Sequence, residues 1–227
     1  MSRPSTILFD LDNTLVDRVR SLAQYAKQFH HDFGADLNPI ELSAIEHVIH
    51  EADQGGYGDK QEMFRHLCHV LPWRQAPSPD TVETHWFSHY PNLAVGMDGL
   101  HDTLHALHTQ GFTLGIITNG TVKSQASKIQ LLKLEPYMRA IVISEAAQVK
   151  KPNPAIFQLA LSQVGSAPAD TWFVGDHPIN DMQGAAACGL TPVWMQGHHA
   201  WPPHLPRTER QIHALPEIFD LLNALSA

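Results

Sequence analysis

The sequence predicts an α/β fold, a doubly wound, Rossmann-like parallel sheet with a helical cap domain inserted near its start. Three observations lead to this prediction. Short apolar runs without polar alternation recur along the chain, which is typical of strands buried on both faces of a parallel sheet. Helical patterns separate most of these runs, as crossover connections require. One long stretch, residues 18–94, shows helical patterns alone.

Five apolar runs are the predicted strands, and each one stops at polar residues or glycine. They cover residues 6–9, 112–117, 140–143, 172–174 and 191–195. Three helices are predicted between or after them: residues 97–108 with Asp98 as N-cap, residues 155–164 after Asn153 and Pro154, and a helix from Asn180 or Asp181 to Gly189. Short polar side chains cap helices, and proline is tolerated in a first helical turn.

The stretch without strands is interpreted as an inserted cap. It includes helical patterns at residues 22–33 and 41–52. These helices could instead pack on the sheet as further crossovers, but one crossover needs far fewer residues. The predicted domains are therefore an α/β core, residues 1–17 and 95–227, and a helical cap, residues 18–94.

Composition narrows the class of protein before any motif is considered. The chain has 227 residues, 43% of them hydrophobic and 17% charged, which is too apolar for a disordered protein. A net charge of −8 argues against binding to nucleic acid, and no apolar run is long enough for a membrane helix. The two cysteines do not make a disulfide framework, so a cytoplasmic protein is expected.

Polar side chains collect where the predicted strands end, and that edge of an open α/β sheet is where ligands bind. The set contains four carboxylates, a hydroxyl, an amide and an ammonium group: Asp10, Asp12, Asp176, Asp181, Thr118, Asn119 and Lys151. Two like charges about 4 Å apart repel by about 4 kcal/mol at an effective dielectric near 20. Lys151 alone cannot balance four acids, so either some are protonated or a cation lies among them. Carboxylate oxygens suit Mg²⁺.

Four segments of the sequence resemble the motifs of the haloacid dehalogenase-like hydrolase superfamily. They are FDLDNTLVD at residues 9–17, IITNG at 116–120, KKPNPAIF at 150–157 and VGDHPINDMQGA at 174–185. All four occur in the order found in that superfamily. The long gap after the first motif resembles the branch with a helical cap at that place, although the cap sequence itself matches less well.

The resemblance implies a role for each acid. Asp10 matches the nucleophile that forms an aspartyl-phosphate, and Asp12 matches the general acid and base. Asp10, Asp176 and the backbone carbonyl of Asp12 match the Mg²⁺ ligands. Asp181 matches a second acid that holds metal-bound water or orients the lysine. It could also be a simple helix cap.

The resemblance assigns the phosphate-binding groups as well. Thr118 and the backbone N–H of Asn119 match groups that bind phosphate. Lys151 matches the lysine that stabilises the nucleophile and the transferred phosphoryl group, whereas Lys150 is expected to be a surface charge. Tyr57, in a glycine-rich cap loop, and His177, inside the fourth motif, are weaker candidates for substrate specificity. The many other histidines are interpreted as surface or cap residues.

These inferences predict a Mg²⁺-dependent phosphatase that hydrolyses small phosphomonoesters such as sugar phosphates or nucleotides. The expected partner is a small phosphate ester, with no nucleic acid or membrane, and the chain is expected to be a monomer or homodimer. Three alternatives stay open on the same fold: a 2-haloacid dehalogenase, a phosphomutase and a non-catalytic phosphate-binding regulator. Asp12 argues against the dehalogenase, in which that position is not acidic.

Overall fold

The computed structural model describes residues 3–225, which divide into two compact units. The core unit comprises the chain up to Val16 and from Gly96 onward, and the helical unit comprises Asp17–Val95. The chain passes between the units through β2 (Val16–Asp17) and β3 (Val95–Gly96), which pair with each other.

A six-stranded sheet forms the centre of the core unit. Its order is β5-β4-β1-β6-β7-β8, and all neighbouring strands are parallel. The strands are β1 (Thr6–Phe9), β4 (Thr113–Thr118), β5 (Met138–Ile143), β6 (Thr171–Gly175), β7 (Thr191–Met195) and β8 (Gln211–Ile212). The predicted α/β fold is confirmed, with β8 as an addition. β8 has only two residues and no apolar run, so the sequence pattern does not indicate it.

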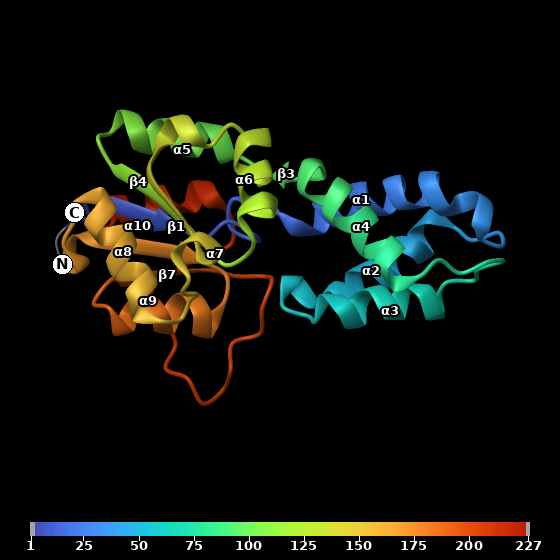
Figure 1. The fold of residues 1–227 in the computed structure, drawn as a ribbon. Helices are drawn as coiled ribbons and strands as arrows, with labels where there is room; N and C mark the ends of the chain where they lie inside the picture. Colours follow the sequence, from blue (N-terminus) through green and yellow to red (C-terminus); the bar gives the residue numbers. More distant parts are fainter. Residues whose placement is uncertain (1–2, 226–227) are drawn as a thin grey trace. The chain divides into compact units, whose positions relative to one another are not determined.

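Helices cover both faces of this sheet. They are α5 (Leu100–Thr109), α6 (Val122–Leu131), α7 (Ser144–Ala147), α8 (Pro154–Val164), α9 (Gly184–Ala187) and α10 (Ile218–Asn223). Figure 1 shows α8 and α9 on one side of the sheet and α5 on the other. Shorter helical turns join the elements: η4 (Glu135–Tyr137), η5 (Pro168–Asp170), the π-helix η6 (Pro178–Gln183) and η7 (Leu215–Glu217).

Two predicted helix starts are wrong. Asp98 does not cap a helix, because α5 begins at Leu100 after Gly99, whose φ of 72° is a conformation that glycine adopts readily. The helix predicted from Asn180 or Asp181 begins earlier, at Pro178. There the His177 ring accepts hydrogen bonds from the N–H groups of Ile179 and Asn180, both at 3.1 Å. A histidine cap is not among the usual cap residues, which explains why the sequence pattern missed it.

Four helices make up the helical unit: α1 (Arg18–Phe33), α2 (Leu42–Asp53), α3 (Lys60–Val70) and α4 (Pro79–His89). One-turn segments join them: η1 (Gly34–Asp36), η2 (Gln54–Gly56) and η3 (Tyr90–Leu93). Side-chain caps start three of the helices, because Asp17, Asp59 and Ser78 each accept a hydrogen bond from a first-turn N–H. No helix among the described residues combines the length and the apolar character that a membrane span needs.

An aromatic cluster holds the helical unit together. The Tyr25 ring on α1 meets the Trp86 ring on α4 edge-on at 4.6 Å, and the Trp86 ring stacks on Tyr90 at 4.2 Å. All three side chains are buried. Trp73 packs against the same cluster. Tyr57, in contrast, is exposed. The apolar faces of the helices thus meet in a core of their own.

A buried ion pair also lies inside the helical unit. The guanidinium of Arg18 donates two hydrogen bonds to the Asp53 carboxylate, both 2.6 Å long, and Lys60 Nζ donates a third at 2.8 Å. Burial acts to raise the pKa of Asp53, but Arg18 and Lys60 outweigh it and lower that pKa. The carboxylate is therefore charged in the folded protein and fully paired.

We expect Asp53→Ala to lower the free energy of unfolding of the helical unit by about 3–5 kcal/mol, because the change removes the buried carboxylate that both Arg18 and Lys60 bind. Denaturant unfolding at neutral pH measures this loss. Asp36→Ala, an exposed site in the same unit, is the matched control and should change stability by less than about 0.5 kcal/mol. Because the folded pKa is lowered, the stabilisation is present above about pH 4 and should fade below it. An equal effect at the two positions would contradict the prediction.

Candidate active site

The candidate active site lies at the carboxyl ends of the central strands. Asp10 directly follows β1, and its N–H donates to the carbonyl of Val174 on β6 at 2.8 Å. Asp176 follows β6, and Thr118 ends β4. β1 lies between β4 and β6, where the chain changes its direction of travel across the sheet. Such a switch point is where open α/β sheets bind ligands.

Lys151 lies between two of the acids. Its Nζ donates to Asp10 Oδ1 at 2.5 Å and lies 2.8 Å from Asp181 Oδ1. Burial acts to lower the pKa of Lys151, but the two carboxylates outweigh it and raise that pKa. Burial raises the pKa of Asp10, and Asp181 and Asp176 add to this increase while Lys151 opposes it. One ammonium group thus does not compensate the negative charge of the cluster.

Asp176 is the acid whose carboxylate has the fewest hydrogen-bond partners among the described residues. It is completely buried, and neither carboxylate oxygen accepts a hydrogen bond from the described residues. His199 Nε2 lies 3.3 Å from Asp176 Oδ2, but without hydrogen-bond geometry. Ligand oxygens of Asp10, Asp176 and Asp181 all lie within 4.8 Å of one another. Because a buried carboxylate normally has partners, this arrangement indicates a place for a cation.

Asn119 fixes the backbone of the lysine rather than reaching a carboxylate. Its side-chain oxygen accepts from the N–H of Lys151 at 2.9 Å, and its side-chain amide donates to the Lys151 carbonyl at 3.1 Å. The peptide bond between Lys151 and Pro152 is cis. The side chain of Asn119 therefore positions Lys151. The role in phosphate binding predicted for Asn119 concerns a different group, its backbone N–H.

The structure adds two residues that the sequence analysis missed, Gln125 and Lys128 on α6. Lys128 Nζ donates to both carboxylate oxygens of Asp12 at 2.8 Å. The Gln125 amide donates to Asp12 Oδ2 at 3.0 Å and to the hydroxyl oxygen of Thr118 at 2.6 Å, and Gln125 Oε1 accepts from Lys128 at 2.9 Å. A hydrogen-bonded chain thus connects Asp12 with Thr118.

This network changes the charge balance of the site. From the sequence, Lys151 was the only cation expected among the four acids. Lys128 is a second one, and only 3% of its side chain is exposed. A signal was present in the sequence. Gln125 and Lys128 are three residues apart in a helix that starts directly after Thr118-Asn119-Gly120, so both lie on the helix face nearest that strand end.

The two weaker candidates have different surroundings. The backbone N–H of His177 donates to Asp181 Oδ2 at 2.9 Å, and its ring lies 4.8 Å from that of His199. His177 is therefore in contact with the acid cluster. Tyr57 belongs to the helical unit, where 44% of it is exposed. Tyr57 and the acid cluster therefore belong to different units.

Comparison with known proteins identifies the family. The family model described as haloacid dehalogenase-like hydrolase matches residues 7–195, which include all seven of the site residues listed from the sequence. The chain is a haloacid dehalogenase-like hydrolase. The resemblance stated from the four motifs is thereby confirmed, and the helical insertion between β1 and β4 agrees with the branch that carries its cap there.

Relatives of this haloacid dehalogenase-like hydrolase include several phosphatases. Glyceraldehyde 3-phosphate phosphatase from Pyrococcus furiosus is 28% identical over 99% of this chain and 94% of the relative. Pyrophosphatase PpaX from Bacillus pumilus is 27% identical over 89% of each chain. The crystal structure of the putative hydrolase YfnB from Bacillus subtilis, bound to magnesium, has a TM-score of 0.77 at 23% identity and covers 98% of this chain and 100% of its own. That likeness confirms the fold.

Proposed function

We propose that this protein is a Mg²⁺-dependent phosphatase that hydrolyses small phosphomonoesters. The observation that carries the proposal is the buried cluster of Asp10, Asp176 and Asp181, in which Asp176 has no hydrogen-bond donor from the described residues. A nucleophilic aspartate that works without a metal does not need two further buried carboxylates beside it. The phosphatase relatives support the same reaction class.

The residues present fit Mg²⁺. Asp10, Asp176 and the backbone carbonyl of Asp12 would hold the ion. Asp181 would hold either a water molecule bound to the ion or the ammonium group of Lys151. Oxygen ligands are what this ion prefers, and Mg²⁺ keeps several waters when bound by few carboxylates. When bound, the cation screens the negative charge on the phosphate and on the cluster. The two lysines and the divalent cation would together balance the four acids.

In the first proposed step, Asp10 attacks phosphorus in line with the ester oxygen. A bond forms between the Asp10 carboxylate oxygen and phosphorus, while the bond between phosphorus and the ester oxygen breaks with its electron pair. Asp12 donates to that leaving oxygen the proton that it took from water in the second step of the preceding turnover, and the alcohol departs. Lys128 and Gln125 hold Asp12 on both carboxylate oxygens, so its orientation is set before substrate binds.

In the second step, the oxygen of a water molecule attacks phosphorus while Asp12 accepts a proton from that water. The bond between phosphorus and Asp10 breaks, which releases inorganic phosphate and restores the carboxylate. Thr118 is suited to bind a phosphate oxygen throughout. Its hydroxyl oxygen already accepts from Gln125 at 2.6 Å, which leaves the hydroxyl hydrogen to donate. Lys151 stabilises the charge on the transferred group.

We also propose that the helical unit acts as the cap that selects the substrate. Its four helices have an aromatic core of their own, so its loops can vary without altering the sheet. Tyr57, exposed in a loop, is the residue of this unit that we propose for substrate contact, and His177 is the one proposed in the core unit. The relatives act on chemically different phosphates, so the class of phosphomonoester is the part of the proposal that an assay has to supply.

Removal of magnesium tests the proposal. With a panel of phosphomonoesters, we expect phosphate release in Mg²⁺ and a loss of at least about 10²-fold in EDTA, because a metal contributes several kcal/mol to stabilising the transition state. Added Mg²⁺ in excess of EDTA should restore the rate, which distinguishes metal removal from denaturation.

Other outcomes of the same assay would replace the proposal. Full activity in EDTA would contradict a metal-dependent mechanism. Halide release from 2-haloacids without metal would indicate a dehalogenase instead. Movement of phosphate within a sugar phosphate, without free phosphate, would indicate a mutase. Binding of phosphate without any turnover across the panel would favour a regulator.

A further inference from the structure

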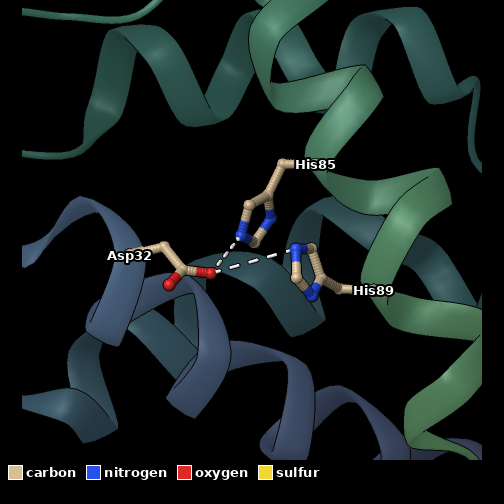
Figure 2. A group of neighbouring side chains, drawn as sticks. All are labelled: Asp32, His85 and His89. Atoms are coloured by element: carbon tan, nitrogen blue, oxygen red, sulfur yellow. Dashed lines mark hydrogen bonds and ion pairs between the residues drawn. The ribbon is translucent and has the colours of Figure 1, made fainter.

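Two histidines and an aspartate face one another inside the helical unit, and they form a group separate from the acid cluster of the core unit. Asp32 comes from α1, and His85 and His89 come from α4 (Figure 2). His85 and His89 are four residues apart, so both point from the same side of α4. One ligand atom from each of the three lies within 4.8 Å of the other two.

The distances suit a small divalent cation with nitrogen and oxygen ligands. Asp32 Oδ2 lies 2.9 Å from His85 Nε2 and 4.0 Å from His89 Nε2, as the dashed lines in Figure 2 mark. Tetrahedral zinc with bonds of about 2.0–2.2 Å separates neighbouring ligand atoms by about 3.3 Å. The first distance is shorter than this and the second is longer. An ion would therefore need Asp32 Oδ2 to move a few tenths of an ångström away from His85 Nε2, and the partly exposed His89 side chain to rotate toward it.

Outer hydrogen bonds hold the proposed ligands in the orientation a metal needs. The Tyr25 hydroxyl lies 3.0 Å from His85 Nδ1, and His85 Nε2 donates to Asp32 Oδ2 at 2.9 Å. When a metal replaces the proton on Nε2, Nδ1 carries the proton and donates it to the Tyr25 oxygen, which holds the ring in the orientation for binding. Gln28 donates to Asp32 Oδ2 at 2.7 Å, and His31 Nδ1 lies 2.8 Å from Oδ1. Metal-binding histidines and carboxylates usually have such partners.

Packing adds to this preparation. The His85 ring lies against the rings of Phe29 and Phe33 at 5.7 and 4.9 Å, and only 10% of its side chain is exposed. Burial lowers the pKa of His85, which favours the neutral ring that a metal requires. The side chains of Asp32 and His89 are 29% and 40% exposed, so an ion can enter from solvent and keep water at its remaining positions.

We propose that Asp32, His85 and His89 form a second metal site, which binds Zn²⁺ or a similar borderline divalent cation such as Co²⁺. Two imidazoles and one carboxylate with an open position are a ligand set that zinc accepts and Mg²⁺ does not prefer. The bound ion would join α1 to α4 and stabilise the helical unit. The proposal does not depend on the phosphatase reaction.

The test is a zinc titration of the full-length, metal-free protein in excess Mg²⁺, which occupies oxygen sites. Competition with a chromogenic chelator gives the affinity, and Co²⁺ gives an absorption band that reports nitrogen ligands. Asp32→Asn and His89→Gln, both at partly exposed side chains, should weaken zinc binding by at least about 10- to 100-fold. His47→Gln is the matched control, because His47 also lies four residues from an acid on a helix of this unit, 3.3 Å from Glu51.

Two further measurements make the result specific. Tyr25→Phe removes only the outer partner of His85 and should weaken zinc binding by about 10-fold. Asp176→Asn removes one carboxylate of the acid cluster. The same titrations on this variant should give an unchanged zinc affinity at the proposed site. Saturating zinc should also raise the melting temperature of the wild type by about 5 °C, but not that of His89→Gln.

Equal zinc affinity in the wild type, Asp32→Asn and His89→Gln would overturn the proposal, as would no zinc binding in the presence of Mg²⁺. An equal loss in His47→Gln would show unspecific binding to surface histidines and would overturn it too. In each of these cases Tyr25, His85 and Asp32 would form a hydrogen-bonded chain only. None of these readouts uses phosphatase activity, so the two proposals can fail separately.

Discussion

Replacement of Asp10 by asparagine should lower kcat for phosphomonoester hydrolysis by about 10⁴-fold or more. The amide has nearly the shape of the carboxylate but is not a nucleophile, so no covalent bond to phosphorus can form. Asp10 is buried, and its Oδ1 accepts from Lys151 at 2.5 Å. The substitution keeps an oxygen that can accept this hydrogen bond, and Asp181 still pairs with Lys151. The fold should therefore persist while the chemistry stops.

Three measurements separate lost chemistry from lost structure. Asp220→Asn makes the same change at an exposed site of α10 and should keep wild-type activity. The melting temperature of Asp10→Asn should stay within a few degrees of the wild type. An acid quench should trap a phosphoryl group on the wild-type chain but not on Asp10→Asn. Turnover within tenfold of the wild type in this variant would rule out Asp10 as the nucleophile.

The sequence predicted the strands and the acids well because their signals are local. An apolar run such as residues 172–174 needs burial on both faces, which a central strand supplies, and polar residues at its end mark the sheet edge. That is why Asp10, Asp176 and Thr118 could be placed at one edge before the structure was known. The order of the strands is not local, since it depends on which strands pair across long separations.

The partners of these residues were not predictable in the same way. The three-residue spacing of Gln125 and Lys128 places both on one helix face, but the spacing alone does not show that this face meets Asp12, whereas Lys123 on the same helix is exposed. Its contact with Asp12 joins residues 116 positions apart. The group of Asp32, His85 and His89 depends likewise on how α1 packs against α4. A pair of histidines four residues apart was the only local indication of it.

The same non-local contact leads to the second large effect. Lys128→Met should lower kcat/KM for an alkyl phosphate by about 10²-fold, because Asp12 loses the two hydrogen bonds with which Lys128 helps to orient it toward the leaving oxygen. Methionine has similar length without the charge. Lys123→Met on the same helix is the matched control, since Lys123 is exposed, and it should change kcat/KM by less than about 2-fold.

The leaving group distinguishes positioning of the acid from general damage. Nitrophenolate departs without a proton, so kcat/KM for 4-nitrophenyl phosphate does not depend strongly on a general acid. For this substrate we expect Lys128→Met to lose less than about 5-fold. Because kcat/KM reports only steps through departure of the leaving group, slower breakdown of the aspartyl-phosphate does not enter the comparison. Equal losses for both substrates would assign Lys128 a role in phosphate binding or in folding.

A double-mutant cycle tests whether Lys128 acts through Asp12. If it does, Lys128→Met should have almost no further effect once Asp12→Asn has removed the general acid, so that the two losses are strongly non-additive. If Lys128 acted on the phosphate directly, its loss would add to that of Asp12→Asn. The bond from Gln125 to both Asp12 and Thr118 makes a second cycle informative. Gln125→Leu should be non-additive with Asp12→Asn for the alkyl phosphate and should raise KM through Thr118 for both substrates.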